Sequence, residues 1–278
     1  MGIWAEIKHA LNSTLGMDTF EPLDVMINNL YGGFFEFSEA GTYTVSIPAS
    51  VRTIKVTACG AGGGGASGAY YTTGKDPHPG NDGGATVIGD LITLAGGGGG
   101  FIDSSSVTKG SGGYAGGKGG GRGGNPYATS KTPENGEDGV LGSGGKATTS
   151  SDTSYAYGAA GGGGSLGKGG DGGIVAKASS DAGSNGSDGE CGAGGGGGGG
   201  CSNTSGYPII GGAGGGGGAA IVDAILKLDE VPAREGKKTI TIIVGAGGKG
   251  GTTTSSKEKA GGNGGDGYVK IEWGLVAL

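Results

Sequence analysis

The spacing of apolar residues divides the chain into parts with different periods. In residues 1–30 the apolar positions follow the spacing of an amphipathic helix that we expect to end at Gly16, and a second short helix is expected to begin at Pro22. The apolar stripe of the first helix contains Trp4, Ile7 and Leu11. Two short helices bury little surface alone. They therefore pack on the rest of the chain, pair in an oligomer, or dock onto another protein.

From Phe34 onward the period changes to two. Alternation of apolar and polar side chains is typical of strands that have one buried face. It predicts strands in the segments 34–37, 43–47, 54–58, 86–94, 239–244 and 268–273. The apolar segment 219–228 also favours a strand, because a long glycine run leads directly into it. We therefore expect an antiparallel β frame built from both ends of the chain.

Glycine dominates the region between these strands. The chain has 77 glycines in 278 residues, and most lie in tracts between about residues 60 and 267. Glycine recurs at every third position from Gly183 to Gly198, and the non-glycine residues of 261–267 have the same spacing. A period of three is that of the extended left-handed helix that lacks internal hydrogen bonds. Such helices can pair their N–H and C=O groups with one another, so we expect a polyglycine II bundle.

The composition of each tract indicates its place in this bundle. Ordering one residue costs about 1 to 2 kcal/mol, and glycine has the most freedom to lose, so the tracts need close mutual packing. We expect the purest runs inside, namely 96–100, 161–164, 194–200 and 214–218. Tracts with polar side chains are expected on the outside, namely those with Lys118, Arg122, Lys168, Asp171, Asn263 and Asp266.

The charge of the chain argues against two classes of partner. A formal net charge of −6 lacks the basic excess that nucleic acids or anionic membranes attract. No apolar run reaches the roughly 18 to 20 residues of a membrane span. Glu6 and Lys8 interrupt the N-terminal apolar stretch, so it does not read as a secretory signal. We expect synthesis in a cytoplasm without a signal peptide, no membrane insertion and no nucleic-acid partner.

No catalytic or metal-binding pattern is evident in the sequence. The only histidines are His9 and His78, which exclude a convincing triad or histidine metal cluster. The three cysteines, Cys59, Cys191 and Cys201, lack metal-type spacing. We expect free thiols, with a Cys191–Cys201 bridge across the intervening glycine run as the alternative. No enzymatic activity, cofactor or metal is therefore expected.

Three segments of the frame resemble glycine-rich proteins that many bacteriophages encode. They are 41–48, 54–61 and 265–273, which enclose the glycine-rich region. Segments 3–8 and 20–24 are similar to the leader of tail-associated proteins from phages of Gram-positive gut bacteria. Two better understood groups share the glycine architecture. Tail-fibre adhesins of T-even-like phages recognise the host through loops between polyglycine II helices, and the glycine-rich domain of the anaplastic lymphoma kinase family inserts such a bundle into a jelly-roll-like frame.

The resemblance implies both a fold and a function. The fold would be mainly β, with a helical attachment segment at 1–31 and a jelly-roll-like antiparallel frame at 32–278 that encloses the polyglycine II bundle. The function would be that of a phage tail adhesin in the virion, fixed to other tail proteins through the N-terminal helices. A homotrimer is the natural expectation for a tail part.

Tyrosines in the polar loops are the candidate receptor-binding residues. They are Tyr70, Tyr71, Tyr127, Tyr155, Tyr157 and Tyr207. An aromatic ring with a polar hydroxyl suits both sugar faces and protein surfaces at low entropic cost. These rings either contact a host glycan or protein, or cap the bundle and cover the frame. The alternative functions are a purely structural virion or tail-fibre subunit, whose loops contact sister subunits, and a bacterial surface binding protein.

Overall fold

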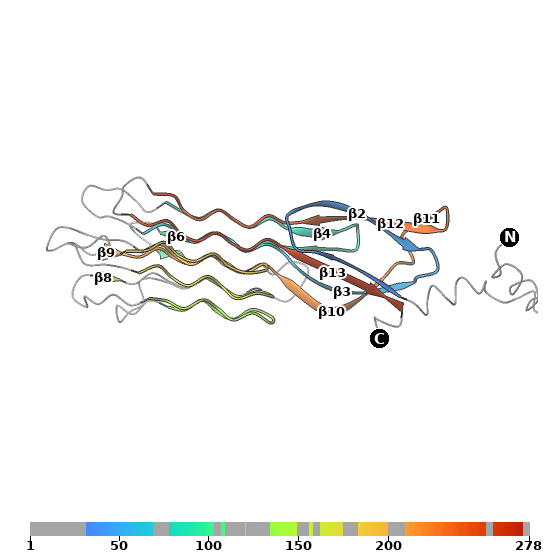
Figure 1. The fold of residues 1–278 in the computed structure, drawn as a ribbon, viewed down its shortest axis with the longest axis horizontal. Coiled ribbons are helices and arrows are strands. Elements are labelled where there is room, and N and C mark those ends of the chain that lie inside the picture. The colour runs from blue at the N-terminus through green and yellow to red at the C-terminus, as the bar shows by residue number, and fades with distance from the viewer. Residues whose placement is uncertain are drawn as a thin grey trace, which may run out of the picture.

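The structure, a computed structural model, joins two antiparallel sheets to a body of extended glycine tracts (Figure 1). It describes residues 32–68, 78–102, 107–108, 120, 134–148, 156–157, 162–174, 183–199, 209–253 and 258–274. These residues contain no helix, and therefore none that is long and apolar enough to cross a membrane. The helices expected at 1–31, with Trp4, Ile7 and Leu11, lie outside the described residues.

Two sheets form the β frame at one end of the molecule. The first has the order β1 (Gly33–Phe37), β13 (Tyr268–Trp273), β3 (Thr53–Cys59) and β10 (Ala220–Lys227). The second has the order β11 (Ala233–Arg234), β12 (Lys237–Val244), β4 (Thr86–Ile88) and β5 (Ile92–Leu94), and β2 (Gly41–Pro48) pairs with β12. All neighbours in both sheets are antiparallel.

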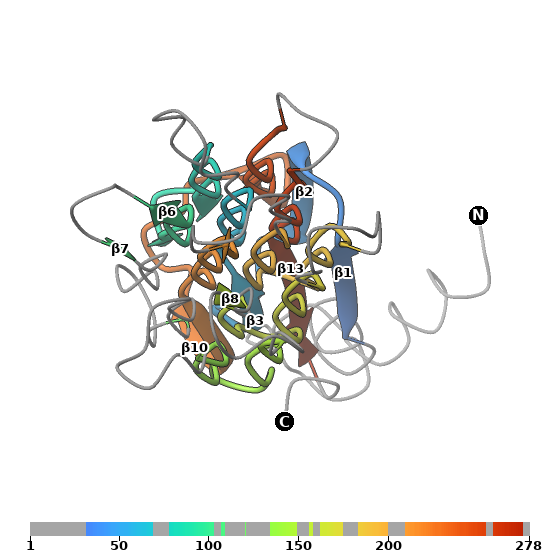
Figure 2. The same cartoon turned by 90° about the vertical axis from the view of Figure 1, so that its left-hand side faces the viewer.

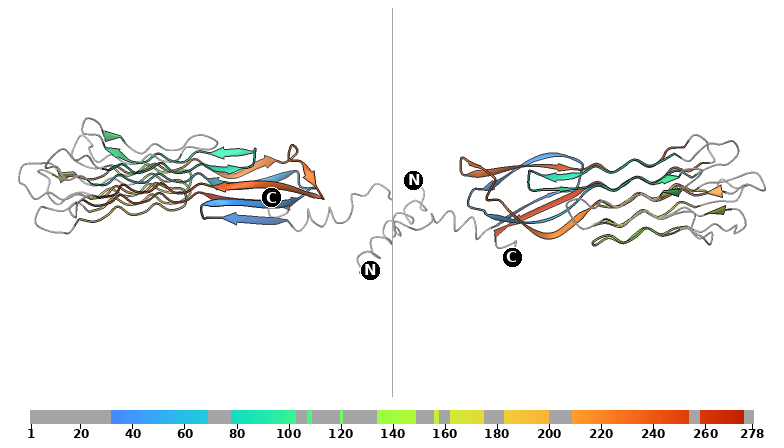
Figure 3. Two further views of the ribbon diagram at one scale, coloured as in Figure 1. Left: turned by 90° about the horizontal axis from the view of Figure 1, so that it is seen from above. Right: turned by 180° about the vertical axis from the view of Figure 1, so that it is seen from behind.

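The inner faces of the two sheets enclose one hydrophobic core. Along β12 every second side chain is buried, including Ile240, Ile242 and Val244. They share a cluster with Val56 and Ile271 of the first sheet. Because the strand period is two, the alternating segments place one apolar face inward, as two packed sheets require. The two sheets lie together at one end of the molecule (Figure 3).

Most of the strands predicted from alternation are confirmed, and one prediction is wrong. The segment 86–94 forms not one strand but a hairpin, β4 and β5, with its turn at Gly89. Gly89 has a φ of 48°, a left-handed conformation that favours glycine. The strand favoured at 219–228 is confirmed as β10, with an irregular register between Ile221 and Ala224.

Several strands of the frame continue directly into glycine tracts. Tract 60–68 follows β3, tract 95–100 follows β5 and tract 245–253 follows β12, whereas tracts 211–219 and 258–267 lead into β10 and β13. Seen along their length, the tracts lie side by side (Figure 2). Two short pairs accompany them, β6 (Phe101–Ile102) with β7 (Val107–Thr108) and, in parallel, β8 (Ala156–Tyr157) with β9 (Ile209–Ile210).

The hydrogen bonds of tract 60–68 repeat every three residues. Its successive N–H groups donate to three neighbours in turn, and every third N–H returns to the same neighbour. The acceptors lie in 213–219, 78–84 and 259–265, and their numbers fall as the donor numbers rise, so these neighbours run antiparallel. The carbonyl groups of the tract accept N–H groups from three further tracts, at 97–100, 195–198 and 248–251. Tract 60–68 is thus surrounded by six others and is buried along its whole length.

Close approach of these backbones explains why glycine is required. A Cβ atom built on Gly63 would lie less than 3.0 Å from the backbone of Gly98, and one on Gly62 equally close to Ala193. Such distances are sterically forbidden, so a side chain would push the tracts apart. The hydrogen bonds between tracts offset the entropic cost of ordering so many glycines.

Candidate functional site

The ends of the tracts away from the sheets meet in one region, which we call the distal end (Figure 1). The N–H of Ser67 donates to the carbonyl of His78 at 2.9 Å, and the N–H of Gly68 donates to Lys259 at 2.9 Å. Gly199 donates to Ser184, which in turn donates to Ile174. These residues border the connecting segments 69–77, 175–182, 200–208 and 254–257. These four connecting segments therefore begin and end together at the distal end.

Side-chain hydrogen bonds fix several of these chain ends. The N–H of His78 donates to the hydroxyl of Ser67 at 2.8 Å, and the N–H of Ile174 donates to the hydroxyl of Ser184 at 2.8 Å. The hydroxyl of Thr148 donates to the carbonyl of Gly173. The distal end thus holds the starting points of the connecting segments in defined positions.

The structure places only one of the six candidate tyrosines, and only by its backbone. Tyr157 lies in β8 opposite Ile210 of β9. The other candidates, Tyr70, Tyr71, Tyr127, Tyr155 and Tyr207, lie outside the described residues, as does the side chain of Tyr157. β8 and β9 pair in parallel, so the backbone of Tyr157 runs beside residues 209–210.

The outer faces of the tracts carry a sequence repeat that the sequence analysis missed. The pattern Asn-Gly-x-Asp-Gly occurs at 135–139, 185–189 and 263–267. In every copy the Oδ1 atoms of both Asn and Asp accept a backbone N–H of a neighbouring tract at 2.6 to 3.0 Å. The donors are Ala147 and Gly144, Ala260 and Asn263, and Gly250 and Gly247. The three-residue spacing puts both side chains on the same side of the tract, where they replace the carbonyls of an absent neighbour.

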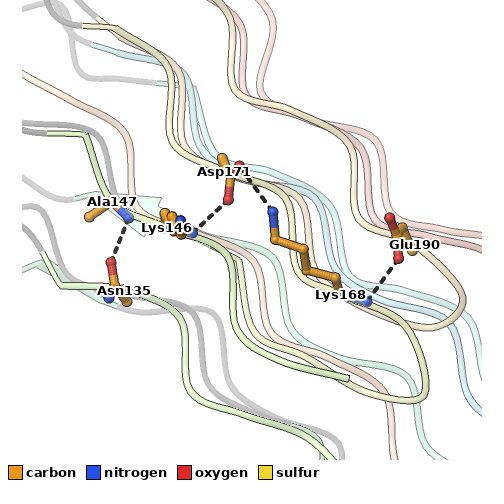
Figure 4. A network of polar contacts seen from close by, with 6 residues as sticks. All are labelled: Asn135, Lys146, Ala147, Lys168, Asp171 and Glu190. Atoms are coloured by element: carbon orange, nitrogen blue, oxygen red, sulfur yellow. Dashed lines mark hydrogen bonds and ion pairs between the residues drawn. The ribbon is translucent and has the colours of Figure 1, made fainter. Parts of the chain in front are cut away.

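Charged side chains link three tract segments on one outer face (Figure 4). Asp171 accepts the N–H of Lys146 at 2.7 Å and the ammonium group of Lys168 at 3.1 Å, while Glu190 accepts the N–H of Lys168 at 3.2 Å. Partial burial raises the pKa of Asp171, but the N–H of Lys146 and the Lys168 ammonium outweigh it and hold the pKa below its usual value of 3.8. Every strong acceptor here serves a neighbouring tract, so this face is a structural link.

Asp266 connects the glycine tracts with the frame, and its removal should be measurable. Its two carboxylate oxygens accept the N–H groups of Gly247 at 2.8 Å and Ala40 at 3.1 Å. We expect Asp266→Ala to lower the free energy of unfolding by about 1 to 3 kcal/mol, because two N–H groups lose a charged acceptor. Chemical denaturation of the variant and the parent protein would measure this loss.

The control is Asp229→Ala, which removes an exposed aspartate from the frame. It should change the stability by less than about 0.5 kcal/mol. Equal stability of both variants would contradict the role given to Asp266.

Within the described part of the chain, no group of three His, Cys, Asp or Glu side chains is placed to hold a metal ion. The described tracts and frame thus offer backbone-bound polar side chains and a distal end at which several tracts begin and end.

Comparison with known proteins bears on the C-terminal third of the chain. Residues 191–277 match the model of a family described as a glycine-rich domain. This match includes the tracts 211–219 and 245–253 and the strands β10 to β13, so it spans both the body and the frame. None of the curated proteins matches the chain. The chain is thus supported as a glycine-rich, mainly β protein.

Proposed function

We propose that the chain is a host-attachment module of a phage tail, in which a polyglycine II bundle displays tyrosine-bearing segments. The proposal of polyglycine II helices rests on the period-three bonding: each tract residue bonds outward, and every third one meets the same neighbour. A jelly-roll-like frame of two sheets would then hold one end of this bundle.

The observation that carries the proposal is the placement of the distal end. Gly33 pairs with Trp273 at the end of the first sheet away from the tracts, so residues 1–31 join the molecule opposite the distal end (Figure 1). The attachment residues Trp4, Ile7 and Leu11 would contact other tail proteins there. The tyrosine-bearing segments would face a host glycan or protein at the other end.

A rigid body favours this use of the connecting segments. Recognition residues are commonly carried by loops on a rigid scaffold, because ordering them in advance lowers the entropic cost of binding. The Asn-Gly-x-Asp-Gly repeats satisfy outward N–H groups within the chain itself. The described tracts beside these repeats therefore need no sister subunit there, which favours an adhesin over a laterally packed shaft subunit.

The direct test is binding of labelled protein to a panel of intact bacteria. We expect the parent protein to label at least one host, and the double variant Tyr155→Ala, Tyr157→Ala to bind at least about tenfold more weakly, as expected for aromatic hot spots. Flow cytometry at several protein concentrations would measure both affinities. Unchanged circular dichroism would show that the variant retains its fold.

The matched control is Leu141→Ala. Leu141 is 67% exposed and lies in the turn of hairpin 134–148. Its N–H donates to Ser165, whose hydroxyl donates to Gly218 just before β10, so the turn lies beside the sheets. Its removal should leave binding unchanged. Equal loss in both variants, or unchanged binding of the tyrosine variant, would overturn the assignment of Tyr155 and Tyr157, and failure to label any host would favour a purely structural tail part.

A further inference from the structure

Two cysteine thiols face each other where the first sheet meets the glycine tracts. Cys59 is the last residue of β3 and is fully buried, and Cys191 lies half-buried in the turn between the tracts that end at Glu190 and begin at Ala193. Their Sγ atoms are 4.0 Å apart, although the two residues are 132 positions apart in the chain. Both thiols are free, as expected from the sequence. The alternative expectation was a Cys191–Cys201 bridge, whereas the thiol beside Cys191 is that of Cys59.

The surroundings favour the approach of the two sulfur atoms. Gly192 has a φ of 73° and directly follows Cys191. A Cβ atom at this position would lie less than 3.0 Å from the sulfur of Cys59. Glycine therefore lets the turn bring its backbone, and with it Cys191, against the end of β3.

We propose that Cys59 and Cys191 form a disulfide modification site that closes when the protein meets an oxidising small-molecule disulfide. An S–S bond is about 2.05 Å long, so the sulfur atoms need to approach by about 2 Å, which small side-chain rotations supply. The inference rests on the thiol geometry alone and is independent of the proposed function.

The reaction is a double thiol–disulfide exchange. With glutathione disulfide as oxidant, the thiolate of Cys191 attacks one sulfur of the reagent, forms a mixed disulfide and releases one glutathione. The thiol of Cys59 then loses its proton to water, attacks the sulfur of Cys191 and releases the second glutathione. The two protein thiols lose two electrons and two protons in total, and the reagent is reduced to two thiols.

The order of attack follows from the environments of the two thiols. The hydrogen bond from Cys59 lowers the pKa of Cys191, while the same interaction and burial raise the pKa of Cys59. Cys191 is also the more accessible of the two. Cys191 is therefore the first nucleophile, and Cys59 resolves the mixed disulfide.

The bond would join the frame covalently to the glycine tracts. A cross-link over so long a stretch of chain reduces the entropy of the unfolded state strongly. We expect the oxidised protein to melt about 5 to 10 °C above the reduced protein. Differential scanning calorimetry of both forms would measure the shift.

Peptide mapping tests the site directly. The native full-length protein is incubated with excess glutathione disulfide, its remaining thiols are alkylated, and its peptides are examined by mass spectrometry without reduction. We expect one peptide pair that links Cys59 to Cys191, with Cys201 alkylated. The variant Cys191→Ser should lose the linked pair and the melting shift, whereas Cys201→Ser should retain both.

Three results would overturn the proposal. They are a bridge between Cys191 and Cys201, a stable glutathione adduct on Cys191 without closure, and three alkylated cysteines after oxidation of the native protein. A linked pair that forms only after the protein has been unfolded in denaturant would also count against a preformed site.

Discussion

Gly195→Ala is expected to prevent stable folding, whereas Gly183→Ala should leave the stability nearly unchanged. Gly195 is buried, its N–H donates to Gly63 and its carbonyl accepts the N–H of Gly215. A Cβ atom there would lie less than 3.0 Å from the carbonyl of Gly262. No single tract can move away, because each is hydrogen-bonded to several others. We expect a loss of more than about 4 kcal/mol, at the upper end of what point substitutions cost.

The matched control lies at an equivalent period-three position. A Cβ atom on Gly183 would meet the carbonyl oxygen of Ile174 at 3.4 Å, an ordinary contact distance. Alanine restricts the unfolded chain more than glycine does, so Gly183→Ala should raise the free energy of unfolding slightly, by up to about 1 kcal/mol. Urea denaturation followed by circular dichroism would compare the two variants. A Gly195→Ala protein with the midpoint of the parent would refute the tight packing of the tracts.

Native protein should resist cleavage by hydroxylamine at its Asn–Gly bonds. Hydroxylamine cleaves this dipeptide after the glycine nitrogen attacks the asparagine side chain to form a cyclic imide. In the folded chain the attacking N–H groups of Gly136, Gly186 and Gly264 donate to Gly145, Ala260 and Gly248. The three asparagine side chains are also held by N–H groups of neighbouring tracts. The tracts must open locally before the reaction can occur.

We expect cleavage at least about 100-fold slower in the native than in the denatured protein, which corresponds to a local opening free energy of about 3 kcal/mol. Electrophoresis of samples taken with time, with and without guanidinium, would give the two rates. In the denatured state Asn263→Gln should lose one cleavage and so identify its fragments. Equal rates in both states would mean that the tracts are not held as described.

The strands could be predicted because their side chains record which face is buried. The alternation in β2, β3, β12 and β13 reflects their inner faces, which share one core. Gly89 ends β4 early, although the apolar residues on both sides of it continue the period of two and so predicted a single strand. Local chemistry at a single turn thus outweighed a regular pattern.

The arrangement of the tracts could not be predicted in the same way. A tract without side chains has no apolar–polar pattern that would indicate which residues it contacts. Its burial therefore depends on the topology of the whole chain. The described parts of runs 161–164, 194–200 and 214–218 are buried, as expected from their purity. Tract 60–68 is equally buried, although Ala61 and Ser67 make it less pure than these runs. Run 96–100, which was selected, is only partly buried.

The sequence revealed less of the polar contacts than of the strands. It predicted that Asn263 and Asp266 lie on the outside; Asn263 is exposed, whereas Asp266 is half-buried. The three copies of Asn-Gly-x-Asp-Gly were not recognised. No sequence feature indicates that Cys59 lies close to Cys191, because no spacing rule connects residues so far apart in the chain. The candidate tyrosines remain a prediction from composition and loop position.

The direct continuation of strands into tracts fixes the hydrogen-bond register between neighbouring tracts. A chain of bare glycines could slide by three residues along its neighbours and remake the same bonds. Tracts 60–68 and 245–253 cannot slip in this way, because β3 and β12 pin them through paired side chains. The hairpins 134–148 and 162–174 have no strand of either sheet at their ends. Length changes in multiples of three are therefore best tolerated in these hairpins, where the body can grow or shorten without disturbing the frame.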